Sequence, residues 1–159
     1  MFKSAVLTLV LLLPILAFAG DWPDRVDGVP TRIVDGDTIH LGGHKIRLLG
    51  IDTPEMKQYC RDDAGMAWPC GRRARDMLVG MVDAGGDMHC RITGRDRYKR
   101  LLGQCFAGGL DVQHALIAAG FGVAEYTPDY KDVEATAKSR KTGMWSGTFQ
   151  RPKDYRRKN

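Results

Sequence analysis

The sequence of 159 residues is long enough for one compact domain. It contains no internal repeat and no low-complexity linker, which excludes a repeat array or a chain of linked domains. The formal net charge of +5 at pH 7 favours polyanionic partners but identifies none of them.

The first 19 residues differ from the rest of the chain. Lys3 gives a positively charged start, an apolar stretch covers residues 5–18, and Ala17-Phe18-Ala19 forms a small-residue cleavage site. This order predicts a secretory signal peptide over residues 1–19, with the mature chain beginning near Gly20. A membrane anchor is the alternative, but the apolar stretch is short for a spanning helix and no second one follows.

Two strands are predicted in the part of the chain that carries most of the candidate chemistry. Residues 31–41 and 44–51 have strand character, and Gly42-Gly43 between them is a hairpin signal. Arg47 lies in the middle of the second strand, on the face opposite Ile46. Four acidic residues lie near the strand ends: Asp35, Asp37, Asp52 and Glu55. Side chains from adjacent strands are therefore expected to converge at one rim of a sheet.

A loop, a helix and a second hairpin are predicted next. Residues 56–70 lack periodicity and are expected to form a loop. Apolar residues at helical spacing predict a helix over residues 72–82, which ends at Gly85-Gly86. Strands are expected at residues 88–93 and 101–106, joined by the polar turn GRDRYKR.

Two further helices complete the predicted domain. One covers residues 112–119 with Asp111 as its N-cap, and the other begins at Thr127-Pro128 and ends near Thr142. Strands followed by interspersed helices indicate a small α+β domain over residues 20–150. The tail over residues 151–159 is basic, and is either a solvated end or a contact for a polyanion.

All four cysteines lie in the predicted exported part, which suggests disulfides formed in an oxidising compartment. Four cysteines allow three connectivities, and their spacing does not match the close pairs of a structural zinc site. Sequential pairing is favoured, joining Cys60 to Cys70 and Cys90 to Cys105, because the second pair flanks the predicted hairpin.

The acidic residues suit a hard divalent cation, which prefers carboxylate, carbonyl and water oxygens. Asp37 and Asp52, on neighbouring strands, are the candidate ligands. The simpler interpretation is that both lie in turns, because Asp, Gly and Pro form turns for local reasons. Arg47 weakens that interpretation, since a guanidinium within a strand has to be paired or functional. An arginine beside a bound metal ion would form an anion site that fits a phosphodiester. In such a site, Glu55 could accept a proton from the attacking water. A salt-bridge role for Arg47 is the alternative.

The chain resembles the staphylococcal nuclease (thermonuclease-like) family. The strings that carry the resemblance are DGDT at 35–38, RLLGIDTPE at 47–55 and DRYKR at 96–100, in the family's order and separations. HALIAAGFGVAEY at 114–126 and GMWSG at 143–147 extend it over residues 28–150, and the cysteines resemble those of an exported, disulfide-bearing branch. The resemblance implies an OB-fold, with a five-stranded β-barrel and three α-helices. It also implies a calcium-dependent phosphodiesterase that cleaves DNA and RNA and leaves 3′-phosphate ends.

The resemblance also implies roles for individual residues. It implies Asp37, Asp52 and the carbonyl of Thr53 as ligands of one calcium ion. It implies Glu55 as the general base and two arginines, Arg47 and Arg100, as the phosphate-binding pair. The residues expected to contact substrate are Tyr98, Lys99 and Tyr126. Lys99 stands where a glycine is common in the family, which puts the turn that aims Arg100 in question.

Three functions are compatible with these residues. The leading hypothesis is an exported nuclease, periplasmic or extracellular, that acts as a monomer without stable membrane association. A non-catalytic OB-fold module that binds nucleic acid is the alternative, and the complete set of acids and arginines argues against it. A hydrolase of another phosphate ester is the third, and the basic hairpin and tail favour a long polyanion instead.

Overall fold

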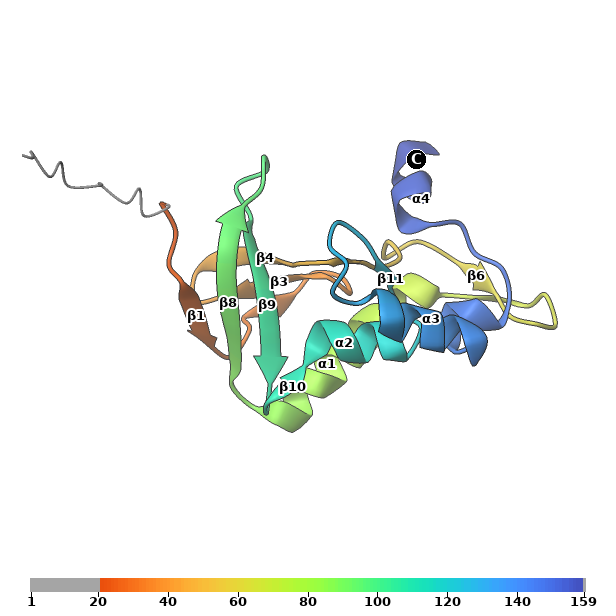
Figure 1. The fold of residues 1–159 in the computed structure, drawn as a ribbon, viewed down its shortest axis with the longest axis horizontal. Coiled ribbons are helices and arrows are strands. Elements are labelled where there is room, and N and C mark those ends of the chain that lie inside the picture. The colour runs from red at the N-terminus through yellow and green to blue at the C-terminus, as the bar shows by residue number, and fades with distance from the viewer. Residues whose placement is uncertain (1–20, 159) are drawn as a thin grey trace, which may run out of the picture.

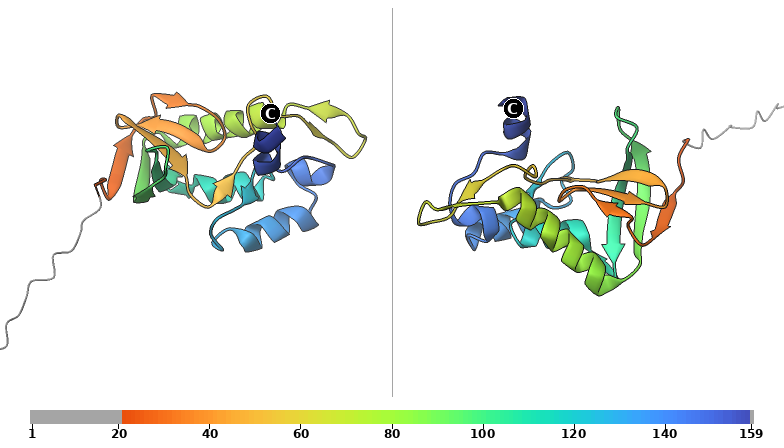
Figure 2. Two further views of the ribbon diagram at one scale, coloured as in Figure 1. Left: turned by 90° about the horizontal axis from the view of Figure 1, so that it is seen from above. Right: turned by 180° about the vertical axis from the view of Figure 1, so that it is seen from behind.

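The structure is a computed structural model that describes residues 21–158, so the predicted signal peptide lies outside the described residues. Figure 1 shows a curled sheet packed beside a group of helices, an α+β arrangement as predicted. The C-terminal helix α4 projects from this body in Figure 1 and in the right-hand view of Figure 2.

Among the described residues the main sheet has seven strands, where the residue pattern located four and the resemblance implied a five-stranded barrel. Its hydrogen-bonded order is β1-β8-β9-β4-β3-β2, and β10 pairs with β9. The β4–β9 pair is parallel and all other pairs in this sheet are antiparallel. The residue pattern did not predict the strands at residues 25–28 and 110–111, and a turn divides the predicted strand over residues 31–41 into two. The strands are β1 (Arg25–Gly28), β2 (Arg32–Ile33), β3 (Thr38–Leu41), β4 (His44–Leu48), β8 (Met88–Arg95), β9 (Leu101–Ala107) and β10 (Leu110–Asp111).

Two small sheets lie outside the main one. β5 (Ile51–Asp52) pairs with β11 (Val123–Ala124), which places Asp52 opposite Val123. β6 (Cys60–Arg61) pairs with β7 (Ala67–Trp68). The segment over residues 56–70, predicted as a plain loop, therefore contains a short hairpin.

The described residues form four α-helices, where the sequence predicted three. They are α1 (Cys70–Gly85), α2 (Val112–Ala118), α3 (Lys131–Ser139) and α4 (Pro152–Lys158), with a 3₁₀ turn η1 (Gly143–Ser146). The extra helix, α4, occupies the basic tail. Asp111 caps α2 as predicted, because its side chain accepts a hydrogen bond from the amide of His114 at 2.9 Å.

Helix α3 begins later than predicted. Its N-cap is Tyr130 and not Thr127. Thr127 lies before the helix, and its amide donates to the carbonyl of Glu125 at 2.9 Å. The Tyr130 hydroxyl reaches Asp111 at 3.1 Å. The observed N-cap of α3 thus makes a tertiary contact with Asp111. Local sequence had placed the N-cap three residues earlier, at Thr127.

The hydrophobic core lies between the inner face of the sheet and one stripe of α1. Strand β9 alternates buried and half-buried residues along its whole length, as expected for a strand with one covered face. Helix α1 buries Ala74, Leu78 and Val82 at helical spacing against this core. The fully buried side chains that fill it include Ile39, Leu41, Ile46, Leu48, Leu101 and Leu116.

The structure contains two disulfides, Cys60–Cys70 and Cys90–Cys105, in the sequential pairing that the sequence favoured. The first closes the β6–β7 hairpin onto the start of α1, and the second joins opposed residues of β8 and β9. Two disulfides are characteristic of an oxidising environment. Among residues 21–158, no helix is both long and apolar enough to cross a membrane.

Candidate active site

Asp37 is fixed by the turn that connects β2 to β3. The amide of Asp37 donates to the Asp35 carboxylate at 3.1 Å, a local contact typical of Asp in turns. Its own Oδ2 accepts from the amide of Thr53 at 2.9 Å and from the Thr53 hydroxyl at 3.2 Å. Its Oδ1 accepts from Arg47 and from the Thr38 hydroxyl. The carboxylate is therefore buried and engaged on both oxygens.

Burial raises the pKa of Asp37 to about 6, because a carboxylate loses hydration in the interior. Arg47 opposes this effect, and the negative charges of Asp35 and Asp52 add to it. The pKa stays high although an arginine contacts the carboxylate directly. A positive charge placed beside Asp37 would lower this pKa.

Arg47 joins the two candidate metal carboxylates. It lies opposite Thr38 in the β3–β4 register and beside Leu102 of β9, so its side chain emerges beside the Asp37 turn. Its guanidinium contacts Asp37 with one nitrogen and Asp52 at 2.9 Å with the other. Burial lowers the pKa of Arg47, but the two carboxylates outweigh that effect and keep it charged.

Asp52 is completely buried at the end of β5, and Glu55 follows it at the edge of the pocket. The backbone amide of Glu55 donates to the buried side chain of Gln58 at 3.2 Å, which holds the loop in place. Arg156 of helix α4 contacts both acids. Its guanidinium donates to the two oxygens of Asp52 and to Glu55, each at 2.9 Å.

The β8–β9 hairpin carries Arg100 over this cluster. Asp96 accepts from the Arg100 side chain at 2.8 Å and from its amide at 3.0 Å, so one aspartate orients the arginine and closes the turn. Lys99 has a φ of 63°, in the left-handed region that the predicted glycine would favour. The turn keeps its tight form with a lysine in place. Tyr98 is exposed, and Arg100 lies over its ring at 5.5 Å.

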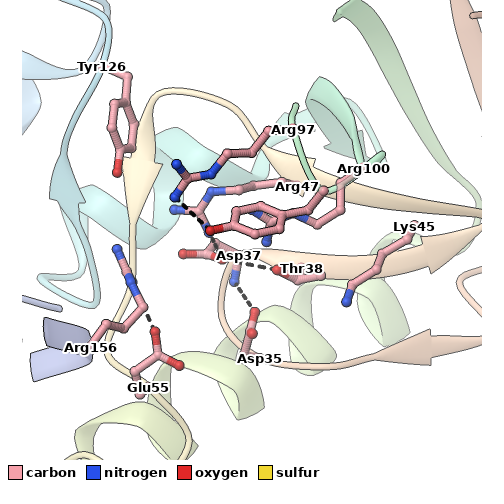
Figure 3. Close-up of a pocket in the computed structure, with 11 residues that line it drawn as sticks. Asp35, Asp37, Thr38, Lys45, Arg47, Glu55, Arg97, Arg100, Tyr126 and Arg156 are labelled. Atoms are coloured by element: carbon pink, nitrogen blue, oxygen red, sulfur yellow. Dashed lines mark hydrogen bonds and ion pairs between the residues drawn. The ribbon is translucent and has the colours of Figure 1, made fainter. Parts of the chain in front are cut away.

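One pocket of about 470 Å³ brings most of the predicted residues together (Figure 3). Tyr126 lies on one side and the basic hairpin on the other, with the acids below. Of the residues singled out from sequence, seven line it: Asp35, Asp37, Arg47, Glu55, Tyr98, Arg100 and Tyr126. Asp52 and Thr53 lie buried behind it, bonded to Arg47 and Asp37, and Lys99 is not among the lining residues.

Sequence reasoning missed three basic or acidic residues of this site. Lys45 lines the pocket and lies two residues before Arg47 in the same strand. Because alternate residues of a strand share a face, its position could have been predicted from that of Arg47. Asp96, which orients Arg100, begins the DRYKR turn, where Asp is common for local reasons. Arg156 was visible only as one of several basic residues in the tail. No local pattern distinguishes it from Arg157.

The residues present fit a hard cation better than a soft one. The described residues contain no group of three or more His, Cys, Asp or Glu side chains arranged to hold a metal. Arg47 contacts both buried carboxylates, Asp37 and Asp52, and Arg156 contacts Asp52 as well. Such a small oxygen donor set suits an ion that keeps several waters or takes substrate oxygens as ligands.

The chain is similar in sequence to several known proteins, among them proteins named as endonucleases. A 117-residue stretch of the chain is 38% identical to the succinoglycan biosynthesis protein ExoI of Rhizobium meliloti, covering 71% of this chain and 61% of that protein. The chain is 32% identical over 146 residues to an uncharacterized endonuclease of Escherichia coli, covering 84% of this chain and 88% of the relative. It is 30% identical to the endonuclease YhcR of Bacillus subtilis, of which it covers 11%.

The family model described as staphylococcal nuclease homologue matches residues 45–147, which contain Arg47, Asp52, Glu55 and the basic hairpin. The OB-fold expected from the sequence is the fold of this domain, and here it takes the form of a curled, open sheet with helices. The chain therefore belongs to the staphylococcal nuclease homologue family.

Proposed function

We propose that this chain is an exported nuclease that hydrolyses phosphodiester bonds in DNA and RNA with little sequence preference, using one divalent cation, calcium. The observation that carries the proposal is the convergence of Arg47, Glu55 and Arg100 on one pocket beside two buried carboxylates. The endonuclease names of the Escherichia coli and Bacillus subtilis relatives support the reaction class.

The chemistry assigned to each residue follows from its charge and place. Glu55 accepts a proton from a water molecule as that water attacks phosphorus. Arg47 and Arg100 bind the phosphate oxygens and stabilise the negative charge that grows in the transition state. The new bond joins the water oxygen to phosphorus, and the bond to the 5′ oxygen breaks. That oxygen takes up a proton from solvent water as it leaves, and the other fragment ends in a 3′-phosphate.

Asp37, Asp52 and the carbonyl of Thr53 are the residues that would hold the cation. When bound, the cation would act as a Lewis acid toward a phosphate oxygen. Tyr98 and Tyr126, both exposed at the pocket, are placed to contact the nucleotides beside the cleaved bond by stacking or hydrogen bonding. Lys99, in the β8–β9 turn next to Tyr98, adds positive charge that would attract the phosphates of the nucleic-acid backbone.

Export to the periplasm or the cell exterior is part of the proposal and rests on the predicted signal peptide and the two disulfides. We expect a monomer without stable membrane association. A non-catalytic nucleic-acid-binding module is the competing proposal, because the same pocket without turnover would still bind a polyanion.

The test is digestion of single-stranded and double-stranded DNA and of RNA with calcium, with magnesium and with a chelator. Glu55→Gln should lower kcat by about 10²- to 10⁴-fold, since general base catalysis contributes that much, and should leave nucleic-acid affinity nearly unchanged. Asp63→Asn is the control, because it also removes one negative charge, while Asp63 is exposed and does not line the pocket. Binding without cleavage by the unmodified chain in every metal would favour the binding module.

A further inference from the structure

Helix α4 is attached to the body mainly by polar contacts. The carbonyl of Gln150 accepts from the Gln58 side chain at 2.6 Å, Arg151 pairs with Glu125 at 2.7 Å, and the Tyr155 hydroxyl donates to the carbonyl of Lys57 at 3.4 Å. In the described part of the chain, neither hydrophobic cluster includes a residue of α4. The helix also has only seven residues, fewer than an isolated helix needs to be stable in water. Pro152 at the start of the helix is buried, but the two core clusters do not depend on α4.

Arg156 is the residue by which α4 reaches the candidate active site. Its guanidinium binds both oxygens of Asp52 in the bidentate manner typical of arginine and carboxylate, and one of the same nitrogens also binds Glu55. These residues are 104 and 101 positions away in the sequence. Figure 3 shows Arg156 extending from the edge of the pocket toward Glu55.

The contacts of Arg156 use the oxygens that a metal ion would need. An ionised carboxylate offers about four acceptor positions. Arg156 takes two of those on Asp52, and Arg47 takes a third. The oxygens of Asp37 are engaged by Arg47, Thr38 and Thr53. About one acceptor position of Asp52 remains, and a divalent cation placed there would meet the positive charge of Arg156 on the same carboxylate, so the cation and Arg156 compete for Asp52.

We propose that Arg156 is a tethered competitor for the divalent cation, so that α4 lowers the metal affinity of the site until the arginine leaves Asp52 and Glu55. This inference rests on the proposed function, because it assigns the same carboxylates to the metal. Two states follow: one in which Arg156 occupies the acids and one in which the cation does. Because only the second state binds metal, the apparent affinity is reduced by the fraction of chains in the first.

The experiment measures calcium binding by titration calorimetry in the absence of nucleic acid, with the full mature chain and three variants. Arg156→Ala removes the competitor and should tighten calcium binding by about tenfold, within the range usual for coupling between two states. Arg157→Ala is the matched control, because it removes the same charge from the same helix, yet Arg157 pairs with Asp154 and not with the site. A chain that ends at Gln150 removes α4 altogether and should behave like Arg156→Ala.

Each outcome decides the matter. Tighter binding by Arg156→Ala and by the shortened chain, with Arg157→Ala within about twofold of the unmodified protein, supports the competition. Equal tightening by all three variants overturns it, because net charge alone would then explain the effect. Unchanged or weaker binding by Arg156→Ala also overturns it, and the proposed function stands if the unmodified chain binds calcium. Absence of calcium binding in every protein overturns the metal requirement as well. If Arg156→Ala does not fold, judged by thermal unfolding, the shortened chain decides.

Discussion

Replacement of Gly71 by alanine would test whether the start of α1 positions Glu55. Gly71 is the second residue of α1, and a Cβ built on it would lie 1.8 Å from the carbonyl oxygen of Glu55. The amide nitrogen of Met56 would be 3.1 Å away. The atom in the way belongs to the backbone, so no side-chain rotation relieves the contact.

The size of the effect follows from this distance. Real Cβ contacts below 3.0 Å essentially do not occur, so the Glu55 backbone and the helix must separate by at least about 1.2 Å. A displacement near 1 Å at a reacting group can lower the rate by about 10²-fold. Overpacking of this kind costs about 1–3 kcal/mol of the free energy of unfolding. Gly71→Ala is therefore expected to lose about 10²-fold in kcat and 1–3 kcal/mol in stability.

Gly80→Ala provides the matched control. Gly80 lies on the exposed face of the same helix, and a Cβ added there would meet no atom within 4 Å. Alanine is the better helix former, so this variant should gain about 0.5–1 kcal/mol and keep its activity. DNA hydrolysis and chemical unfolding of the three proteins decide the question. Gly71→Ala with normal kcat would refute the idea that this contact places Glu55, even if stability fell.

Two further predictions concern the pocket and the hairpin. Arg47→Lys should lower kcat by at least about 10²-fold, because lysine cannot form a bidentate contact with a phosphate. Hydrolysis kinetics measure this loss, with Arg32→Lys, at an exposed position of β2, as the control. A loss below tenfold would leave Arg47 with only a structural role, as the partner of an ion pair. Lys99→Gly should raise the free energy of unfolding by about 0.5–1 kcal/mol, because the cost of about 1–2 kcal/mol for a left-handed lysine exceeds the entropic cost of glycine. Urea denaturation checks this prediction, and a drop in stability would mean that the lysine side chain stabilises the turn.

Local sequence predicted the elements whose causes are local. The Gly42-Gly43 hairpin, the apolar stripe of α1 and the Asp111 cap each depend on a few neighbouring residues, and each is present in the structure. The start of α3 was misplaced, and the tail was not recognised as a helix. Tyr130 reaches Asp111 across 19 positions, and α4 contacts the loop near residue 57 across 98. Contacts between residues so far apart in the sequence cannot be predicted from the local spacing of apolar and polar residues.

The sequence by itself predicted most of the charged groups of the candidate site, but not Lys45, Asp96 or Arg156. The acids at the strand ends, Arg47 at mid-strand and the DRYKR turn predicted an oxygen-ligand cluster beside arginines suited to phosphate, because strand geometry and short turns fix their separations. The tertiary structure decided how these charges are paired. It placed Arg156 on Asp52 and Glu55, Asp96 on Arg100, and the start of α1 against the Glu55 backbone. Pairing between distant charges depends on the path of the whole chain, so local sequence patterns do not specify it.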